Sequence, residues 1–210
     1  MMKNNLTIYI ADDHTVVRNA MTRLLKTFSR IGEVKDAANG KELIKLIKEK
    51  TPDAVVLDIE MPVMGGIDTA QFLLSHFPDV KILMLTMHTE EAFIKRLIDL
   101  CVNGFLAKTT EPEEMERAIY SIVDNDFYKG DLMNSANLIK KTADPTLEKL
   151  SNRELEILLL ICQEYSPGEI STRLNISEKT FNNHRSSIIA KTGAKNNIGL
   201  YKYAVQHGYL

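Results

Sequence analysis

The sequence predicts an α/β fold, a doubly wound five-stranded parallel sheet, followed by a small all-α domain of four helices. Three observations support this. Up to residue 125, apolar strand-like runs alternate five times with helical stretches. The strand-like runs are continuously apolar, as in strands buried on both faces of a parallel sheet. Beyond residue 147 only helical periodicity remains, so we expect a second domain there.

The strand-like runs lie at 6–11, 33–38, 54–57, 80–85 and 103–106. The first is followed by apolar residues at helical spacing from Val17 to Phe28, and later helical stretches lie at 41–50, 67–77, 90–100 and 112–125. We expect the strand order 2-1-3-4-5, in which functional groups collect beyond the carboxyl ends of the strands.

Residues 126–147 lose this rhythm and are rich in Asp, Asn, Lys, Gly and Pro, which is typical of an exposed connector. The chain therefore divides into a first domain at 1–125, a linker at 126–147 and a second domain at 148–210. In the second domain Ser151, Ser166 and Ser177 are candidate helix N-caps. The first two form capping boxes with a glutamate three residues later. The last helix, 197–207, carries Ile198, Tyr201 and Val205 on one face.

Charge is unevenly distributed along the 210 residues, although the formal net charge is only −2. Residues 1–125 hold 15 basic and 19 acidic side chains, whereas residues 177–210 hold five basic side chains and one acidic one. A basic tail fits contact with phosphates, but a solvated lysine-bearing face would look the same. The two cysteines form no CxxC, and no stretch approaches the roughly 18 apolar residues of a membrane span. We therefore expect a cytoplasmic protein with reduced thiols.

Polar residues follow four of the five predicted strands. Asp12 and Asp13 end the first strand, Asp58 the third and Thr86 the fourth, and Lys108 lies just past the fifth. In the expected strand order the three carboxylates converge, and oxygen ligands of this kind suit Mg²⁺. Taken singly, each residue is more often a helix cap or a surface charge. Together they favour a site in which Asp58 accepts a phosphoryl group, with Thr86 and Lys108 binding its oxygens.

Residues 6–125 resemble the response-regulator receivers, which have a flavodoxin-like fold. The resemblance lies in Asp12-Asp13, Asp58-Ile59-Glu60-Met61-Pro62, Leu85-Thr86 and the segment Gly104 to Lys108. It implies that Asp13, Asp58 and the backbone carbonyl of Glu60 bind Mg²⁺ directly, that Asp12 acts largely through water, and that Thr86 and Phe105 form a switch. The phosphoryl donor it implies is a sensor histidine kinase. Gly65 and Met87 depart from the usual pattern, from which we expect an altered phosphate lifetime.

Residues 150–208 resemble the LuxR-type helix-turn-helix of the NarL/FixJ family through Leu150-Ser151, Arg153-Glu154, Glu169-Ile170-Ser171, Leu174 to Ser177, Thr180, His184, Lys191 and Gly193. The resemblance implies base contacts with double-stranded DNA by Asn182, Asn183 and Ser186. Lys179, His184, Lys191 and Lys195 would lie nearer the DNA backbone. Asn182, Gly168 and Asn196 depart from the family pattern where polar or basic residues are common, which predicts a shallower salt dependence of DNA binding.

The sequence thus predicts a two-component transcriptional regulator that is not a dedicated enzyme. When phosphorylated it would form a homodimer through Ile198, Tyr201 and Val205. A Mg²⁺-dependent phosphohydrolase with Asp58 as nucleophile is one alternative, although such enzymes usually carry the nucleophile after the first strand. In a second alternative the protein binds DNA independently of phosphorylation, and the first domain is a constitutive dimerisation unit. A third interprets residues 148–210 as a helical bundle that binds protein.

Overall fold

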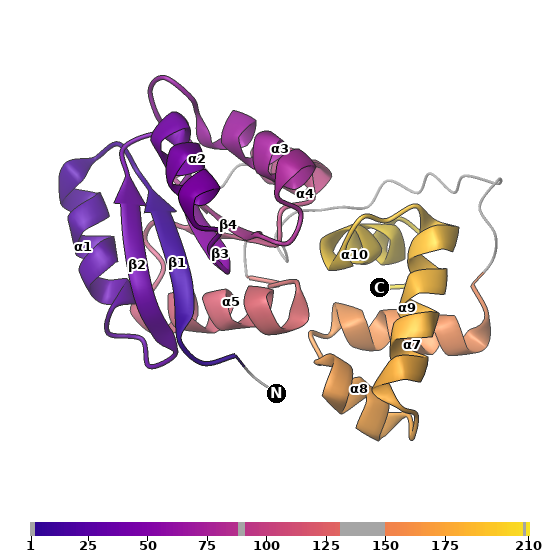
Figure 1. Cartoon of the computed structure of the whole chain (residues 1–210). Helices are drawn as coiled ribbons and strands as arrows, with labels where there is room; N and C mark the ends of the chain where they lie inside the picture. Colours follow the sequence, from indigo (N-terminus) through magenta and orange to yellow (C-terminus); the bar gives the residue numbers. More distant parts are fainter. Residues whose placement is uncertain (1–2, 88–90, 131–149, 208) are drawn as a thin grey trace.

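The computed structural model describes residues 3–87, 91–130, 150–207 and 209–210. It contains an α/β domain followed by a smaller helical domain (Figure 1). Residues 131–147 of the predicted linker lie outside the described residues. Among the described helices, none is both long and apolar enough to cross a bilayer. Cys101 and Cys162 are both free thiols.

The sheet of the first domain has five parallel strands in the order β2-β1-β3-β4-β5, as predicted. The strands are β1 (Leu6–Ala11), β2 (Ile31–Ala37), β3 (Ala54–Asp58), β4 (Lys81–Thr86) and β5 (Gly104–Ala107). Asp58 pairs with Leu85, and Thr86 pairs with Ala107. The carboxyl ends of the strands therefore form one edge, and the residues that follow them meet there.

Helices cover both faces of this sheet (Figure 1). The helices α2 (Gly40–Glu49), α3 (Gly66–His76) and α4 (Glu91–Leu100) pack on one face, and α1 (Thr15–Leu25) and α5 (Pro112–Asn125) pack on the other. Successive side chains of β3 alternate between the two layers: Val55 and Leu57 join the first, while Ala54 and Val56 join the second. Burial of both faces explains why the strands are continuously apolar.

The second domain contains α7 (Asn152–Cys162), α8 (Pro167–Arg173), α9 (Glu178–Thr192) and α10 (Asn197–Gln206). The predicted starts are confirmed. Ser151 and Ser166 each form a capping box with Glu154 and Glu169, and Ser177 accepts a hydrogen bond from the backbone N–H of Thr180. The turn between α8 and α9 includes Asn175 in the left-handed conformation (φ 51°), which asparagine tolerates. Two helices joined by this tight turn form a helix-turn-helix.

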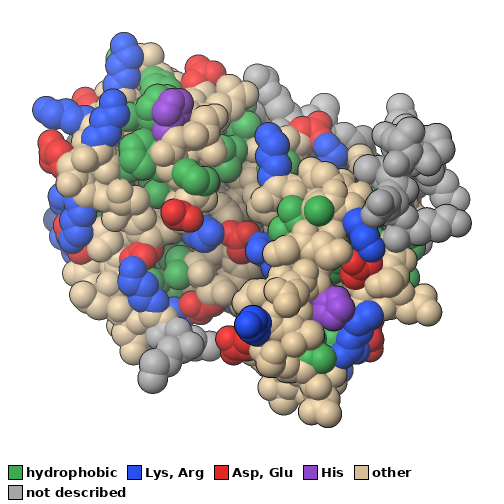
Figure 2. All heavy atoms as spheres, turned by 45° about the vertical axis from the view of Figure 1, so that its right-hand side comes forward, with side chains coloured by type: hydrophobic (Ala, Val, Ile, Leu, Met, Phe, Trp, Pro, Cys, Tyr) green, Lys and Arg blue, Asp and Glu red, His purple; other side chains and the backbone are tan. Residues whose placement is uncertain are grey.

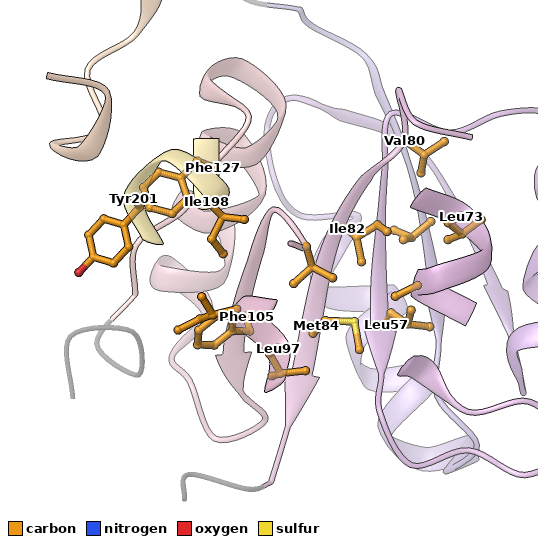
Figure 3. Close-up of a cluster of buried hydrophobic side chains, with 14 of the residues drawn as sticks. Leu57, Leu73, Val80, Ile82, Met84, Leu97, Phe105, Phe127, Ile198 and Tyr201 are labelled. Carbon is orange, nitrogen blue, oxygen red and sulfur yellow. The ribbon is translucent and has the colours of Figure 1, made fainter. Parts of the chain in front are cut away.

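The start of the predicted linker is buried, in contrast to the exposed connector expected from its composition. Phe127 is 1% exposed and Tyr128 is 4% exposed. Figure 3 shows Phe127 next to Tyr201 and Ile198 of α10, and the ring centroids of Phe127 and Tyr201 are 5.8 Å apart. Two neighbouring aromatic side chains bury a large apolar area, which outweighs the polar composition around them. Phe127 thus belongs to the contact between the domains, whereas Tyr128 packs among residues of the first domain.

Candidate functional site

An acidic pocket lies at the carboxyl edge of the sheet, where the sequence predicted it. Asp12 and Asp58 are almost fully buried, and Lys108 extends between them. Its Nζ is 2.9 Å from Oδ2 of Asp12 and 2.8 Å from Oδ2 of Asp58. The backbone N–H of Lys108 donates to the carbonyl of Thr86, which ties the lysine to the end of β4. Residues from β1, β3 and the loop after β5 therefore meet in one site.

The charges in this pocket are incompletely balanced, because one ammonium group faces two buried carboxylates. Burial raises the pKa of Asp58 above its ordinary value; Lys108 acts in the opposite direction, and Asp12 adds to the rise. Burial alone would lower the pKa of Lys108, but its ion pairs with Asp58 and Asp12 outweigh this effect and raise it. A second cation would relieve the repulsion between the carboxylates.

The ligand atoms present suit a divalent metal ion. One ligand atom from each of Asp12, Asp13, His14 and Asp58 lies within 4.8 Å of the others. Oδ1 of Asp13 is buried, and Nδ1 of His14 lies 2.9 Å from it. Three carboxylates this close together repel one another unless a cation binds them. The fit of this oxygen-rich set to Mg²⁺ is therefore good.

The remaining predicted residues of the first domain lie around the pocket or behind it. Thr86 is 1% exposed at the end of β4, whereas Glu60 is exposed on the loop after β3. Phe105 is 1% exposed on β5 and packs in the apolar cluster with Leu97 (Figure 3). Met87, one of the two departures from the receiver pattern, is 66% exposed.

The predicted DNA-contact residues lie on α9 and just beyond it, and most of them are accessible. The exposed side chains are Lys179, Asn182, Asn183, Ser186 and Lys195, and His184 is half-buried. Lys191 differs from the others because its ammonium group points inward, 2.9 Å from Oε2 of Glu154. In this structure Lys191 therefore stabilises the helical domain, and it would have to leave Glu154 to bind a phosphate.

Glu154 is the charged centre of the helical domain, a role beyond the capping box that the sequence predicted. Besides Lys191, Ser187 donates a hydrogen bond to it (2.6 Å), and so does the backbone N–H of Ser151 (2.7 Å). Burial alone would raise the pKa of Glu154, but the donors Ser187, Lys191 and Ser151 outweigh it and lower the pKa to about 2. This carboxylate joins α7 to α9.

A polar cluster centred on Asp126 joins the two domains. Asp126 follows α5 in the left-handed conformation (φ 68°). Its carboxylate accepts hydrogen bonds from Lys81 (2.6 Å), from Asn103 (3.0 Å) and from Arg185 of α9 (3.1 Å). Nearby, the side-chain amide of Asn197 donates to the backbone carbonyl of Asn125 (2.6 Å). Arg185, one of the five basic side chains in residues 177–210, thereby ties the helix-turn-helix to the first domain.

The predicted dimerisation residues are largely covered by this contact. Ile198 is 0% exposed and Tyr201 is 6% exposed, while Val205 is half-buried. Helix α10 also packs against α4, and Asn196 at its N-cap donates to the carbonyl of Cys101. Figure 2 shows a hollow between the domains with acidic and basic side chains along it. Asn182 of α9 and Asp124 of α5 both line a crevice between the domains.

The structure joins a 2-1-3-4-5 sheet, which has a carboxylate–lysine pocket at its carboxyl edge, to a helix-turn-helix. These features define a receiver coupled to a DNA-binding domain. Comparison with known proteins agrees. Residues 8–120 match the response regulator receiver domain, and residues 148–204 match the bacterial regulatory proteins of the luxR family. The chain belongs to the response regulators of two-component systems, in the group with a LuxR-type DNA-binding domain.

The similarity extends over both domains. The chain is 32% identical over 208 residues to the response regulator UvrY of Escherichia coli (strain K12), covering 97% of this chain and 95% of that protein. A solved complex of the response regulator RcsB with DNA has a TM-score of 0.60 and 26% identity, covering 97% and 99% of the two chains. Another structure, of two RcsB dimers bound to two parallel DNAs, has a TM-score of 0.59 and 25% identity, with the same coverage.

Proposed function

We propose that this response regulator accepts a phosphoryl group on Asp58 from a sensor histidine kinase, with Mg²⁺ held in the acidic pocket, and that phosphorylation opens the contact between its domains. Two copies then bind paired half-sites on DNA through α9 and alter transcription. The observation that carries this proposal is the buried, incompletely balanced group formed by Asp12, Asp58 and Lys108 at the carboxyl edge of the sheet.

The geometry of Asp58 suits a nucleophile. Its Oδ1 accepts a hydrogen bond from the backbone N–H of Ile59 (2.8 Å), which orients the carboxylate, and its Oδ2 faces Lys108. After phosphoryl transfer, Lys108 can pair with a phosphoryl oxygen instead of the carboxylate, and the hydroxyl of Thr86 can donate to another. Asp13, Asp58 and the carbonyl of Glu60 would hold Mg²⁺, with Asp12 acting largely through water. When bound, the ion neutralises charge on the carboxylates and on the incoming phosphoryl oxygens.

The contact between the domains supports a switch, because it restricts both surfaces needed for output. Ile198 and Tyr201, which we propose for dimerisation, pack against the first domain and Phe127. Asn182, although exposed, lines a crevice between the domains, where the first domain would obstruct the approach of DNA. DNA binding by a dimer therefore requires an arrangement in which the two domains have separated. The RcsB dimers on DNA support pairing of two copies.

The test is phosphorylation with acetyl phosphate and Mg²⁺, read by intact mass and by DNA affinity. The matched variants are Asp58→Asn and Asp68→Asn, the latter changing an exposed carboxylate in the first turn of α3. We expect one phosphoryl adduct in the wild type and in Asp68→Asn, none in Asp58→Asn, and DNA binding that is tighter by on the order of tenfold after modification.

Other outcomes separate the alternatives. An adduct that persists in Asp58→Asn would contradict the assignment of the acceptor. An adduct without any change in DNA affinity would favour a first domain that only dimerises. Continuous turnover of a phosphomonoester would favour the phosphohydrolase. Binding of a protein partner but no DNA would favour the helical bundle.

A further inference from the structure

Arg185 is a cation of α9 to which the proposed DNA contacts give no part. It stands three residues after Asn182 and directly before Ser186, both of which are exposed. Side chains three residues apart on a helix are neighbours, and Arg185 and Asn182 line the same crevice between the domains. The guanidinium of Arg185 therefore lies on the flank of the helix face that we propose for base contacts.

Two residues hold this guanidinium, one from each domain. Within the helical domain, Oδ1 of Asn197 accepts hydrogen bonds from Nε (3.2 Å) and Nη2 (3.0 Å) of Arg185. From the first domain, Oδ2 of Asp126 accepts a hydrogen bond from Nη2 (3.1 Å). Separation of the domains removes Asp126 but keeps Asn197 in place. It therefore leaves an arginine that is already oriented and has lost its counter-charge.

A DNA phosphate can take the place of this counter-charge. Carboxylate and phosphate are both oxyanions that suit the guanidinium fork. Side chains beside the base-reading residues commonly bind the phosphates at the edge of the groove. The side chain of Arg185 is 29% exposed, so its charged end reaches solvent. While Asp126 occupies its edge, however, a second anion would be repelled there.

The cations of the helical domain show why one arginine matters. Residues 177–210 hold five basic side chains, and three of them, Arg185, Lys191 and Lys202, form ion pairs in this structure. Within the part of the chain that the structure describes, Lys179 and Lys195 form none. Lys191 is held inside its own domain, whereas the partner of Arg185 belongs to the other domain. With so few cations available, one more phosphate contact changes both the affinity for DNA and its salt dependence measurably.

We propose that Arg185 exchanges Asp126 for a DNA phosphate, so that the ion pair that closes the domains and a contact that binds DNA use the same side chain and exclude one another. This inference rests on the proposed function in taking α9 to be the DNA-binding helix. It adds a phosphate contact and a direct competition between the first domain and DNA. By linkage, DNA weakens the contact between the domains by the same factor by which that contact weakens DNA binding.

The test breaks the ion pair from each side in the unphosphorylated full-length protein and measures DNA affinity against salt concentration. Asp126→Asn should bind DNA more tightly than the wild type. Adding Arg185→Gln to Asp126→Asn should weaken binding by about tenfold relative to Asp126→Asn alone. The slope of log affinity against log salt should become shallower by about one. Both effects should be similar on a duplex selected by the wild type from random sequences and on an unrelated duplex, because a phosphate contact does not read bases.

Two further variants, made in the Asp126→Asn background, separate a phosphate contact from a structural role. Arg185→Lys keeps the charge but loses the fork that binds Asn197, so its salt slope should stay close to that of Asp126→Asn. Lys202→Ala is the matched control, because it removes a cation of α10 that is also paired across the domain contact, and it should change neither affinity nor slope. Equal affinities with and without Arg185→Gln, or an Arg185→Lys variant as impaired as Arg185→Gln, would overturn the inference.

This inference and the proposed function fail in different ways. If phosphorylation of Asp58 tightens DNA binding while Arg185→Gln has no effect in the Asp126→Asn background, only the role of Arg185 is wrong. If none of these proteins binds either duplex, DNA binding by α9 is wrong and the role of Arg185 fails with it. Loss of affinity and of slope with Arg185→Gln, together with normal phosphorylation of Asp58, supports both.

Discussion

Each domain contains a buried carboxylate beside a lysine, but the pKa values of the two carboxylates shift in opposite directions. Asp58 shares Lys108 with Asp12, and its pKa is raised by burial. Glu154 has Lys191 to itself and also accepts hydrogen bonds from Ser187 and Ser151, and its pKa is lowered to about 2. Burial raises the pKa of both carboxylates, and the direction of the net shift depends on whether hydrogen-bond donors and cations outweigh it.

This difference separates a structural carboxylate from a reactive one. Glu154 is stable as an anion, so it holds α7 and α9 together and offers little to a ligand. The carboxylates of the pocket lack sufficient positive charge, so they gain from any cation that enters and from a reaction that changes their charge. Incomplete compensation is thus what identifies the pocket as the functional site.

The largest effect we expect is on the structural carboxylate. Glu154→Ala should destabilise the helical domain by about 2–3 kcal/mol, because it leaves Lys191 without its partner and removes a capping box. Chemical denaturation followed by circular dichroism measures this change. The control is Glu156→Ala, which removes an exposed carboxylate on the same helix. Similar losses in both variants would mean that the buried interactions of Glu154 add nothing.

The pH dependence of stability sharpens the same contrast. Because the pKa of Glu154 is lowered to about 2 from an ordinary value of 4.5, its stabilisation is complete above the ordinary value and is lost as pH falls toward 2. The stability difference between the wild type and Glu154→Gln should therefore shrink across that range. A difference that stays constant with pH would contradict the lowered pKa.

Asp58→Asn should change the stability of the protein in the opposite direction to Glu154→Ala. Without divalent ions at pH 7, we expect this variant to be more stable than the wild type by about 1 kcal/mol, because it removes one of two neighbouring buried charges. A raised pKa means that the wild type loses stability as pH rises toward the folded pKa, so the advantage of the variant should vanish in acid. Saturating Mg²⁺ should reverse the order by stabilising the wild type. Denaturation curves with and without Mg²⁺ test this, and a destabilised variant in the absence of the ion would contradict it.

A third carboxylate, Asp126, is partly exposed and has three donors, two of them cationic. Asp126→Asn keeps a residue that tolerates the left-handed backbone but removes the charge. We expect it to weaken the contact between the domains by about 1 kcal/mol. The radius of gyration from X-ray scattering and the DNA affinity of the unphosphorylated protein should both increase. Asp79→Asn, on an exposed carboxylate lining the larger crevice between the domains, should change neither.

The smallest effect should come from Lys202, which pairs with Asp99 across the same contact. The carboxylate of Asp99 is 62% exposed, so solvent screens the pair. Lys202→Ala should weaken the contact between the domains by less than about 0.5 kcal/mol, so the radius of gyration and the DNA affinity should stay close to those of the wild type. An effect as large as that of Asp126→Asn would contradict the view that burial and the number of donors determine how much each carboxylate stabilises the protein.

The sequence predicted what depends on local pattern. The parallel, doubly wound sheet followed from continuously apolar strands. The convergence of Asp12, Asp58 and Lys108 followed from the strand order expected for that fold, because each stands at a strand end. The capping boxes at Ser151 and Ser166 were equally local. Whether each predicted residue performs its assigned role stays a prediction for the experiments above.

What the sequence did not predict depends on how two domains pack together. The pairing of Asp126 with Arg185 joins residues far apart in the chain, and no local periodicity encodes it. The burial of Phe127 was obscured by polar neighbours, although two consecutive aromatic residues in a polar segment were a signal.

Strand β4 connects the two ends of the receiver. Thr86, which we propose as a phosphate contact, ends the strand, and Lys81, which binds Asp126, begins it. Six residues of extended chain set them roughly 17 Å apart. A strand that is hydrogen-bonded on both sides cannot lengthen, so a displacement at Thr86 would reach Lys81 as a shift of the whole strand. The rate at which the domains separate would then follow the motion of β4.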